Sequence, residues 1–176
     1  LPQPETVRIY LWASSQHSSS PIDSAPEKGI CTNYSNIVTT SMIFRAMLDA
    51  MDAWSTNGKQ PPESQIPTRK DGTLISYEEW CAQFPNIPAN MVPTEPASLK
   101  LLDFGPREDE GILSFPPKII DNDGYTILVP SSDEDGNDVP GIRAPMVQAP
   151  MGTYVGWNIR SRGHGYGATY EFNGSY

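Results

Sequence analysis

Val7-Arg-Ile-Tyr-Leu-Trp-Ala13 is an apolar run of β-branched and aromatic residues that contains no turn former. Runs of this kind are typical of strands that are buried on both faces in a parallel sheet. A polar stretch that contains Gln16 and His17 follows at once. Because reactive groups in open α/β sheets lie on loops beyond the carboxyl ends of strands, this order puts His17 in a position suited to catalysis.

An amphipathic helix is expected next, over residues 39–54. Its apolar residues recur at helical spacing and are read as core; they are Ile43, Met47, Ala50, Met51 and Trp54. Residues 39–41 offer an N-cap, and Asn57-Gly58 offers a stop before Pro61. The chain thus begins with a strand, a histidine loop and a helix, an α/β pattern.

The remainder of the chain is expected to be loop-rich and β-rich. One helical turn is predicted at residues 77–81, and short extended runs are predicted at 99–104, 125–129, 139–143 and 146–149. The acidic stretch 131–138 is interpreted as a solvated turn and residues 121–124 as a hairpin turn. We therefore expect residues 1–60 to form the core part and residues 61–176 an irregular, β-rich C-terminal extension packed on the same domain.

Composition excludes several classes of function. With a formal charge of −9, a pI near 4.6 and only 12 Lys and Arg, the chain has no basic surface for nucleic acid. No apolar run approaches a membrane span, and no N-terminal signal is visible. The compartment is left open, with export as one possibility, and Cys31 and Cys81 fit either a disulfide or two thiols.

No cofactor or metal is expected. The run Asp133 to Asp138 alternates oxygen-bearing residues as a calcium loop does, but Ala144 stands where an EF-hand has Glu. His164 lies in a glycine-rich segment without recognisable partners, so a ligand role is not assigned to it.

A series of short motifs resembles the C-terminal half of a large bacterial family whose members are called alpha/beta hydrolase domain proteins. The matches run in order along almost the whole chain; they include Phe44-Arg-Ala-Met-Leu-Asp-Ala-Met-Asp-Ala-Trp54, Asp103-Phe-Gly-Pro106, Gly141-Ile-Arg143 and Gly152-Thr-Tyr-Val-Gly-Trp-Asn158. The resemblance implies a partial α/β-hydrolase fold, made of the last sheet strand, the histidine loop and the following helix.

The same resemblance implies that His17 is the catalytic histidine of a serine esterase. The family's Gly-Thr-Gln-His segment corresponds here to Ser14-Ser15-Gln16-His17, so two residues depart from the usual pair. In acyl transfer, an imidazole accepts the proton of the serine hydroxyl and returns it to the leaving group. Gln16, Tyr154 and Trp157 are support or substrate-lining candidates.

The nucleophile is expected outside this chain. The sequence contains no Gly-x-Ser-x-Gly elbow, and the resemblance implies that an upstream half holds the serine. The chain also begins without Met, so we expect a fragment that is inactive alone, with the missing half and a small-molecule ester as its partners. Two alternatives remain: a non-enzymatic, acidic, β-rich binding or cell-surface module, and a hydrolase fold whose catalytic machinery has decayed.

Overall fold

The computed structural model describes residues 3–17, 25–96, 99–170 and 172–176, and mixes short helices with short sheets. The chain divides into two units, residues 1–94 with 129–176, and residues 95–128. Each of the three sheets has two strands, which pair as β1 with β4, β2 with β3 and β5 with β6. None of the described helices is long and apolar enough to cross a bilayer.

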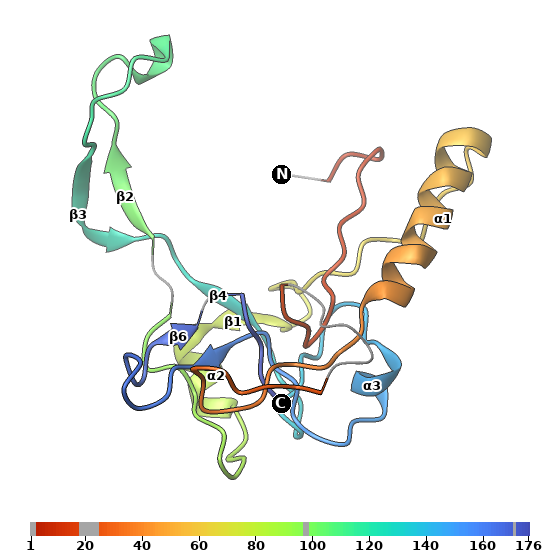
Figure 1. The fold of residues 1–176 in the computed structure, drawn as a ribbon. Helices are drawn as coiled ribbons and strands as arrows, with labels where there is room; N and C mark the ends of the chain where they lie inside the picture. The colour runs from red at the N-terminus through yellow and green to blue at the C-terminus, as the bar shows by residue number, and fades with distance from the viewer. Residues whose placement is uncertain (1–2, 18–24, 97–98, 171) are drawn as a thin grey trace. The chain divides into compact units, whose positions relative to one another are not determined.

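The longest element is the helix α1, Ser41–Asn57 (Figure 1). It ends where the sequence predicted, because Gly58 adopts a left-handed conformation (φ 66°) and its N–H donates to the carbonyl of Trp54. The helix is less buried than predicted. Ile43 packs in the core and Met47 against it, but Phe44, Leu48 and Met51 are each more than half exposed.

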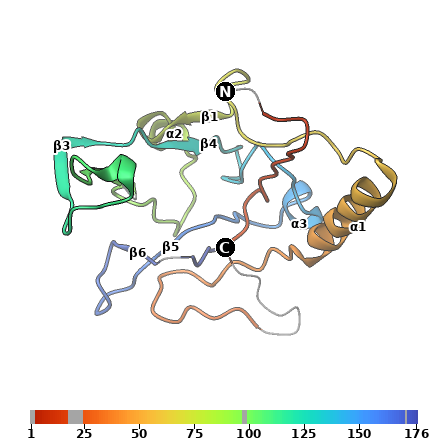
Figure 2. The same cartoon turned by 90° about the horizontal axis from the view of Figure 1, so that it is seen from above.

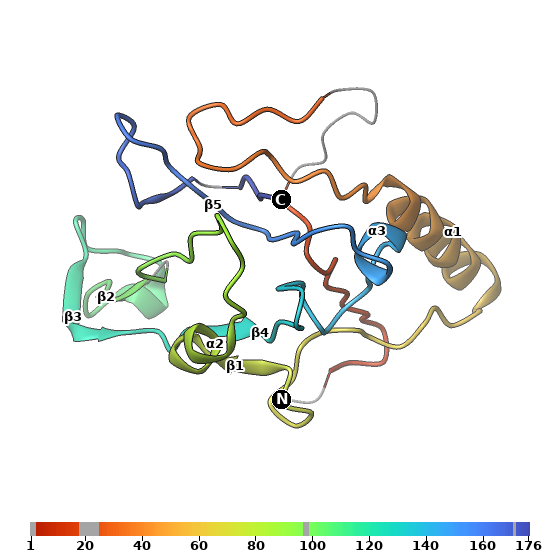
Figure 3. The same cartoon turned by 90° about the horizontal axis from the view of Figure 1, so that it is seen from below.

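The core of the larger unit joins α1 to α3, Pro145–Gln148. These two helices lie side by side in Figures 2 and 3. The buried cluster consists of Val38, Ile43, Ala144, Val147 and Tyr154. Residues 146–149 were predicted to be extended, and this was wrong. Pro145 occupies the first helical position, where its fixed φ favours a helix and its missing N–H costs nothing.

A second group of elements surrounds α2, Tyr77–Gln83. Figure 3 shows α2 beside the paired strands β1, Leu74–Ser76, and β4, Leu128–Pro130. A capping box begins the helix: the N–H of Glu79 donates to Ser76 Oγ, and the N–H of Ser76 donates to the Glu79 carboxylate. The helical turn predicted here is confirmed and extends over seven residues.

The remaining strands form two antiparallel pairs. In the smaller unit, β2, Lys100–Asp103, pairs with β3, Lys118–Gly124, and Glu108–Glu110 form a 3-10 turn between them. The prediction of a hairpin turn at residues 121–124 was therefore wrong, since these residues belong to a strand. In the larger unit, β5, Asn158–Ile159, pairs with β6, Thr169–Tyr170.

Residues 7–13 do not form the doubly buried strand that the sequence predicted. They are extended, but with the other described residues they make only two isolated parallel bridges, Tyr10 with Gln65 and Trp12 with Ile142. Val7 is 37% and Ile9 47% exposed. Prolines explain why neither bridge grows into a ladder: Pro67 follows Gln65 by two residues, Pro140 precedes Ile142 by two, and proline has no N–H to donate.

Candidate functional site

The extended segment of residues 9–13 is hydrogen-bonded along one edge only. Leu11 N–H donates to Gln65 and Ala13 N–H donates to Ile142, while the carbonyls of Ile9 and Leu11 accept from the same two partners. Alternate residues of an extended chain share an edge. Within the described part of the chain, no backbone–backbone hydrogen bond involves Arg8, Tyr10 or Trp12. The Trp12 carbonyl accepts from Ser15 Oγ at 2.9 Å, and the opposite edge is otherwise open.

The segment ends at Ser14, a buried residue with a left-handed backbone (φ 56°). A non-glycine residue in this conformation costs about 1–2 kcal/mol. The resemblance noted above places glycine at this position, and the positive φ explains why glycine suits it. Here a serine occupies the turn, and its polar contacts offset the strain.

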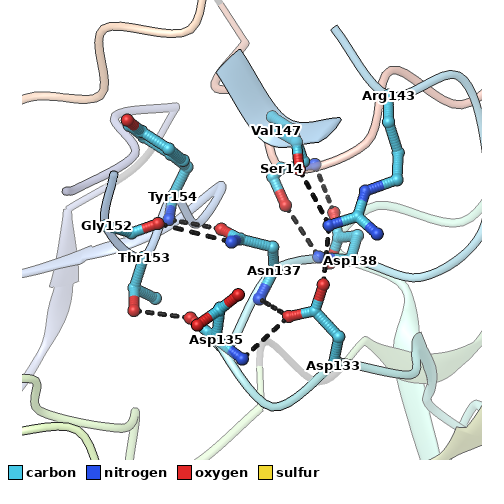
Figure 4. Close-up of polar contacts among 10 residues, drawn as sticks. All are labelled: Ser14, Asp133, Asp135, Asn137, Asp138, Arg143, Val147, Gly152, Thr153 and Tyr154. Carbon is cyan, nitrogen blue, oxygen red and sulfur yellow. Dashed lines mark hydrogen bonds and ion pairs between the residues drawn. The ribbon is translucent and has the colours of Figure 1, made fainter. Parts of the chain in front are cut away.

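Ser14 and Asp138 bond each other reciprocally (Figure 4). The Ser14 N–H donates to Asp138 Oδ2 at 2.6 Å, and the Asp138 N–H donates to Ser14 Oγ at 2.7 Å. Asn36, fully buried, adds a third bond by donating from Nδ2 to the Ser14 carbonyl at 2.8 Å. The turn before the histidine loop is thus fixed from two distant parts of the chain.

The histidine loop itself lies against residues 172–174. Gln16 Oε1 accepts a hydrogen bond from the Gly174 N–H at 3.1 Å, and the His17 N–H donates to the Phe172 carbonyl at 3.2 Å. The His17 ring lies 4.5 Å from the Phe172 ring, centre to centre, and is exposed. Among the described residues, no carboxylate forms an ion pair with His17.

The stretch from Asp133 to Asp138 is not simply the solvated turn that the sequence suggested. Glu134 and Asp135 are exposed, but Asn137 is completely buried. Figure 4 shows the Tyr154 N–H donating to Asn137 Oδ1, at 2.7 Å, and Arg143 paired with Asp133, at 2.6 Å. The loop is therefore held to the rest of the unit by Asp133, Asn137 and Asp138, whereas Glu134 and Asp135 face solvent.

Burial raises the pKa of Asp138 to about 6. The bond from the Ser14 N–H and the charge of Arg143 act in the opposite direction, and the charge of Asp133 adds to the rise. Asp138 lines a cavity of about 300 Å³. Aromatic rings form much of its wall; they belong to Trp12, Tyr77, Trp80 and Trp157.

The candidate residues predicted from sequence lie in three different environments. Gln16 and His17 share the loop on residues 172–174, Trp157 lines the aromatic cavity, and Tyr154 packs in the hydrophobic core with its ring 6.2 Å from that of Tyr176. His164 is exposed. Sequence reasoning missed Ser14, Asn36 and Asp138, because their partners are far away in the chain.

Neither a metal cluster nor a disulfide is found within the residues that the structure describes. No group of three His, Cys, Asp or Glu side chains gathers there as metal ligands would. Cys31 and Cys81 are both free thiols, and burial raises the pKa of Cys31, partly opposed by the charge of Arg160.

A family model described as alpha/beta hydrolase domain matches residues 2–175. The chain belongs to this family. No curated protein and no solved structure matches the sequence. Membership in the alpha/beta hydrolase domain family indicates a hydrolase-type function, which fits a small-molecule substrate.

Proposed function

We propose that this chain supplies His17 as the general base of an ester-hydrolysing serine hydrolase, and that the nucleophilic serine lies in another stretch of polypeptide. The chain would then be the C-terminal part of the catalytic domain and inactive alone. The order of an extended segment, a sharp turn and an exposed histidine supports this proposal most directly. Family membership and the missing Gly-x-Ser-x-Gly motif agree with it.

The open edge at Arg8, Tyr10 and Trp12 is where we expect the remaining sheet to attach. Unpaired backbone groups of an extended segment are a template for another strand. Phe44 and Leu48 form an exposed apolar side of α1. We expect the missing part of the domain to cover this surface as well. A strand added here in the parallel direction would place its own carboxyl end near the loop that carries His17.

In the proposed reaction, the His17 imidazole accepts the proton of the serine hydroxyl as the serine oxygen attacks the ester carbonyl. The imidazolium then donates that proton to the departing alcohol, which leaves an acyl-serine. Water attacks the acyl group in a second, equivalent step, and the carboxylic acid leaves. The acidic residue that orients the imidazole would also come from the other stretch of polypeptide.

The decisive experiment uses a polypeptide that contains both this chain and the segment with the nucleophile. His17→Ala should lower kcat/KM for a p-nitrophenyl ester by roughly 10²–10⁴-fold, the usual contribution of a general base. The matched control is His164→Ala, because His164 is the other histidine of the chain and is also exposed. It should leave kcat/KM unchanged.

Retained activity in His17→Ala would remove His17 from the mechanism. A polypeptide without any nucleophilic serine near this chain would instead favour the alternative of a non-enzymatic binding module. Hydrogen exchange tests the attachment separately. The amides of Tyr10 and Trp12 should exchange rapidly in residues 1–176 alone and slowly once the remaining sheet is present.

A further inference from the structure

The aromatic cavity of the larger unit combines an apolar wall with a single carboxylate. Its volume of about 300 Å³ is at the lower end of the range for small-molecule sites. The apolar lining includes three of the four tryptophans of the chain, Trp12, Trp80 and Trp157. Such rings attract organic cations through the negative faces of their π systems.

Most polar side chains in the wall already have partners. Trp80 Nε1 donates to Ser132 Oγ at 3.0 Å, Ser15 Oγ donates to the Trp12 carbonyl at 2.9 Å, and the Tyr77 hydroxyl donates to the Pro93 carbonyl. Asp138 differs from them. Its Oδ2 accepts from the Ser14 N–H, but no donor within the described residues bonds Oδ1. That oxygen is the acceptor left for a ligand.

The charge at the wall is negative. None of the described residues that line the cavity is a Lys, Arg or His. Arg143 is the positively charged residue whose charge acts on Asp138. Its guanidinium group already donates to the Asp133 carboxylate, at 2.6 Å, and to the Val147 carbonyl, at 2.9 Å. An anionic ligand would meet an uncompensated carboxylate, whereas a cation would pair with it.

We propose that this cavity binds a small primary or secondary ammonium ion with an aromatic or other apolar body. The ammonium group donates to Asp138 Oδ1, and the apolar body lies among the indole rings. A neutral apolar molecule of the same shape would pack among the indole rings but would not form the charged hydrogen bond to Asp138. His17 does not line this cavity, so the binding test does not depend on the outcome of the esterase proposal.

The test compares three ligands of nearly equal size on the purified protein at pH 7.5: 2-phenylethylammonium, 2-phenylethanol and phenylacetate. Binding is followed by calorimetry and by tryptophan fluorescence, to which three wall residues contribute. We expect the ammonium ion to bind at least about tenfold more tightly than the alcohol, the value of one modest charged hydrogen bond. The carboxylate should bind more weakly than both.

Asp138→Asn should remove the preference for the ammonium ion, because the amide keeps an acceptor for the Ser14 N–H but not the charge. The matched control is Asp135→Asn, since Asp135 lies in the same loop and is exposed. It should retain the full preference. Thermal unfolding of each variant shows whether it is folded.

Acidification provides a second measurement on the unmodified protein. Asp138 faces the Ser14 amide and the charges of Arg143 and Asp133, and it becomes protonated below about pH 6. The ligand remains charged there, so its affinity should fall between pH 7.5 and pH 5. Equal affinity for ammonium and alcohol, unchanged binding in folded Asp138→Asn, or equal losses in both variants would each overturn the proposal.

Discussion

Asp138→Asn also tests the electrostatics of the turn that precedes the histidine loop. Burial raises the pKa of Asp138 to about 6, so between its unfolded pKa, near 4, and this value the folded state binds more protons than the unfolded state. The protonated Asp138 carboxyl group therefore stabilises the folded state. This contribution to the free energy of unfolding is fully present below the unfolded pKa and is lost as the pH rises through about 6. One pKa unit corresponds to about 1.4 kcal/mol, which gives a total of about 3 kcal/mol.

About 2 kcal/mol of this loss falls between pH 4.5 and pH 8, because the rest has already occurred at the lower pH. The amide that replaces the carboxyl group in the variant does not titrate. The free energy of unfolding of the unmodified protein should therefore fall by about 2 kcal/mol more over this interval than that of Asp138→Asn. Titrating groups that do not interact with Asp138 contribute equally to both proteins and cancel in the comparison.

Urea unfolding at pH 4.5 and pH 8, followed by tryptophan fluorescence, measures the change in unfolding free energy of each protein between the two pH values. Asp135→Asn is again the control, and its pH dependence should parallel that of the unmodified protein. If Asp138→Asn also parallels the unmodified protein, the carboxyl group is solvated in solution, and the reciprocal Ser14–Asp138 pair described above does not form.

Three further substitutions test the packing around the site, each by urea unfolding. Asn36→Ala should lower the free energy of unfolding by about 2–4 kcal/mol, because it leaves the buried Ser14 carbonyl and the Val38 N–H without partners. Gly58→Ala should cost about 1 kcal/mol, since the left-handed backbone is strained but space is open. Gly141→Ala should cost more, about 2–4 kcal/mol, because its Cβ would lie 2.6 Å from the Leu11 carbonyl oxygen. Equal losses of unfolding free energy at the two glycines would contradict this expectation, because they would show that the chain adjusts around residue 11 at little energetic cost.

Local signals predicted the helices α1 and α2 but not α3. Apolar spacing and Gly58 predicted α1 and its end, and the capping box of Ser76 and Glu79 is a further local signal, at the start of α2. Both signals act within one or two turns of chain. They could not show that Met51 faces outward, because that depends on which elements cover the helix.

The candidate site was harder to predict because its contacts join distant residues. Ser14 and Asp138 are separated by 124 positions, and nothing in either neighbourhood distinguishes this aspartate from the exposed Asp135. The strand at residues 7–13 was overestimated for a similar reason. Its own sequence favours extension, but the length of a ladder depends on prolines in the partner segments.

The contact between Gln16 and Gly174 spans 158 residues, so during translation the histidine loop waits for most of the chain. At ordinary rates of synthesis this interval is roughly ten to thirty seconds. Until then Gln16 has no Gly174 amide to bind, whereas Asp138, the partner of Ser14, is synthesised earlier. The loop that carries His17 therefore gains its contact with Gly174 after the Ser14 turn before it has gained its aspartate.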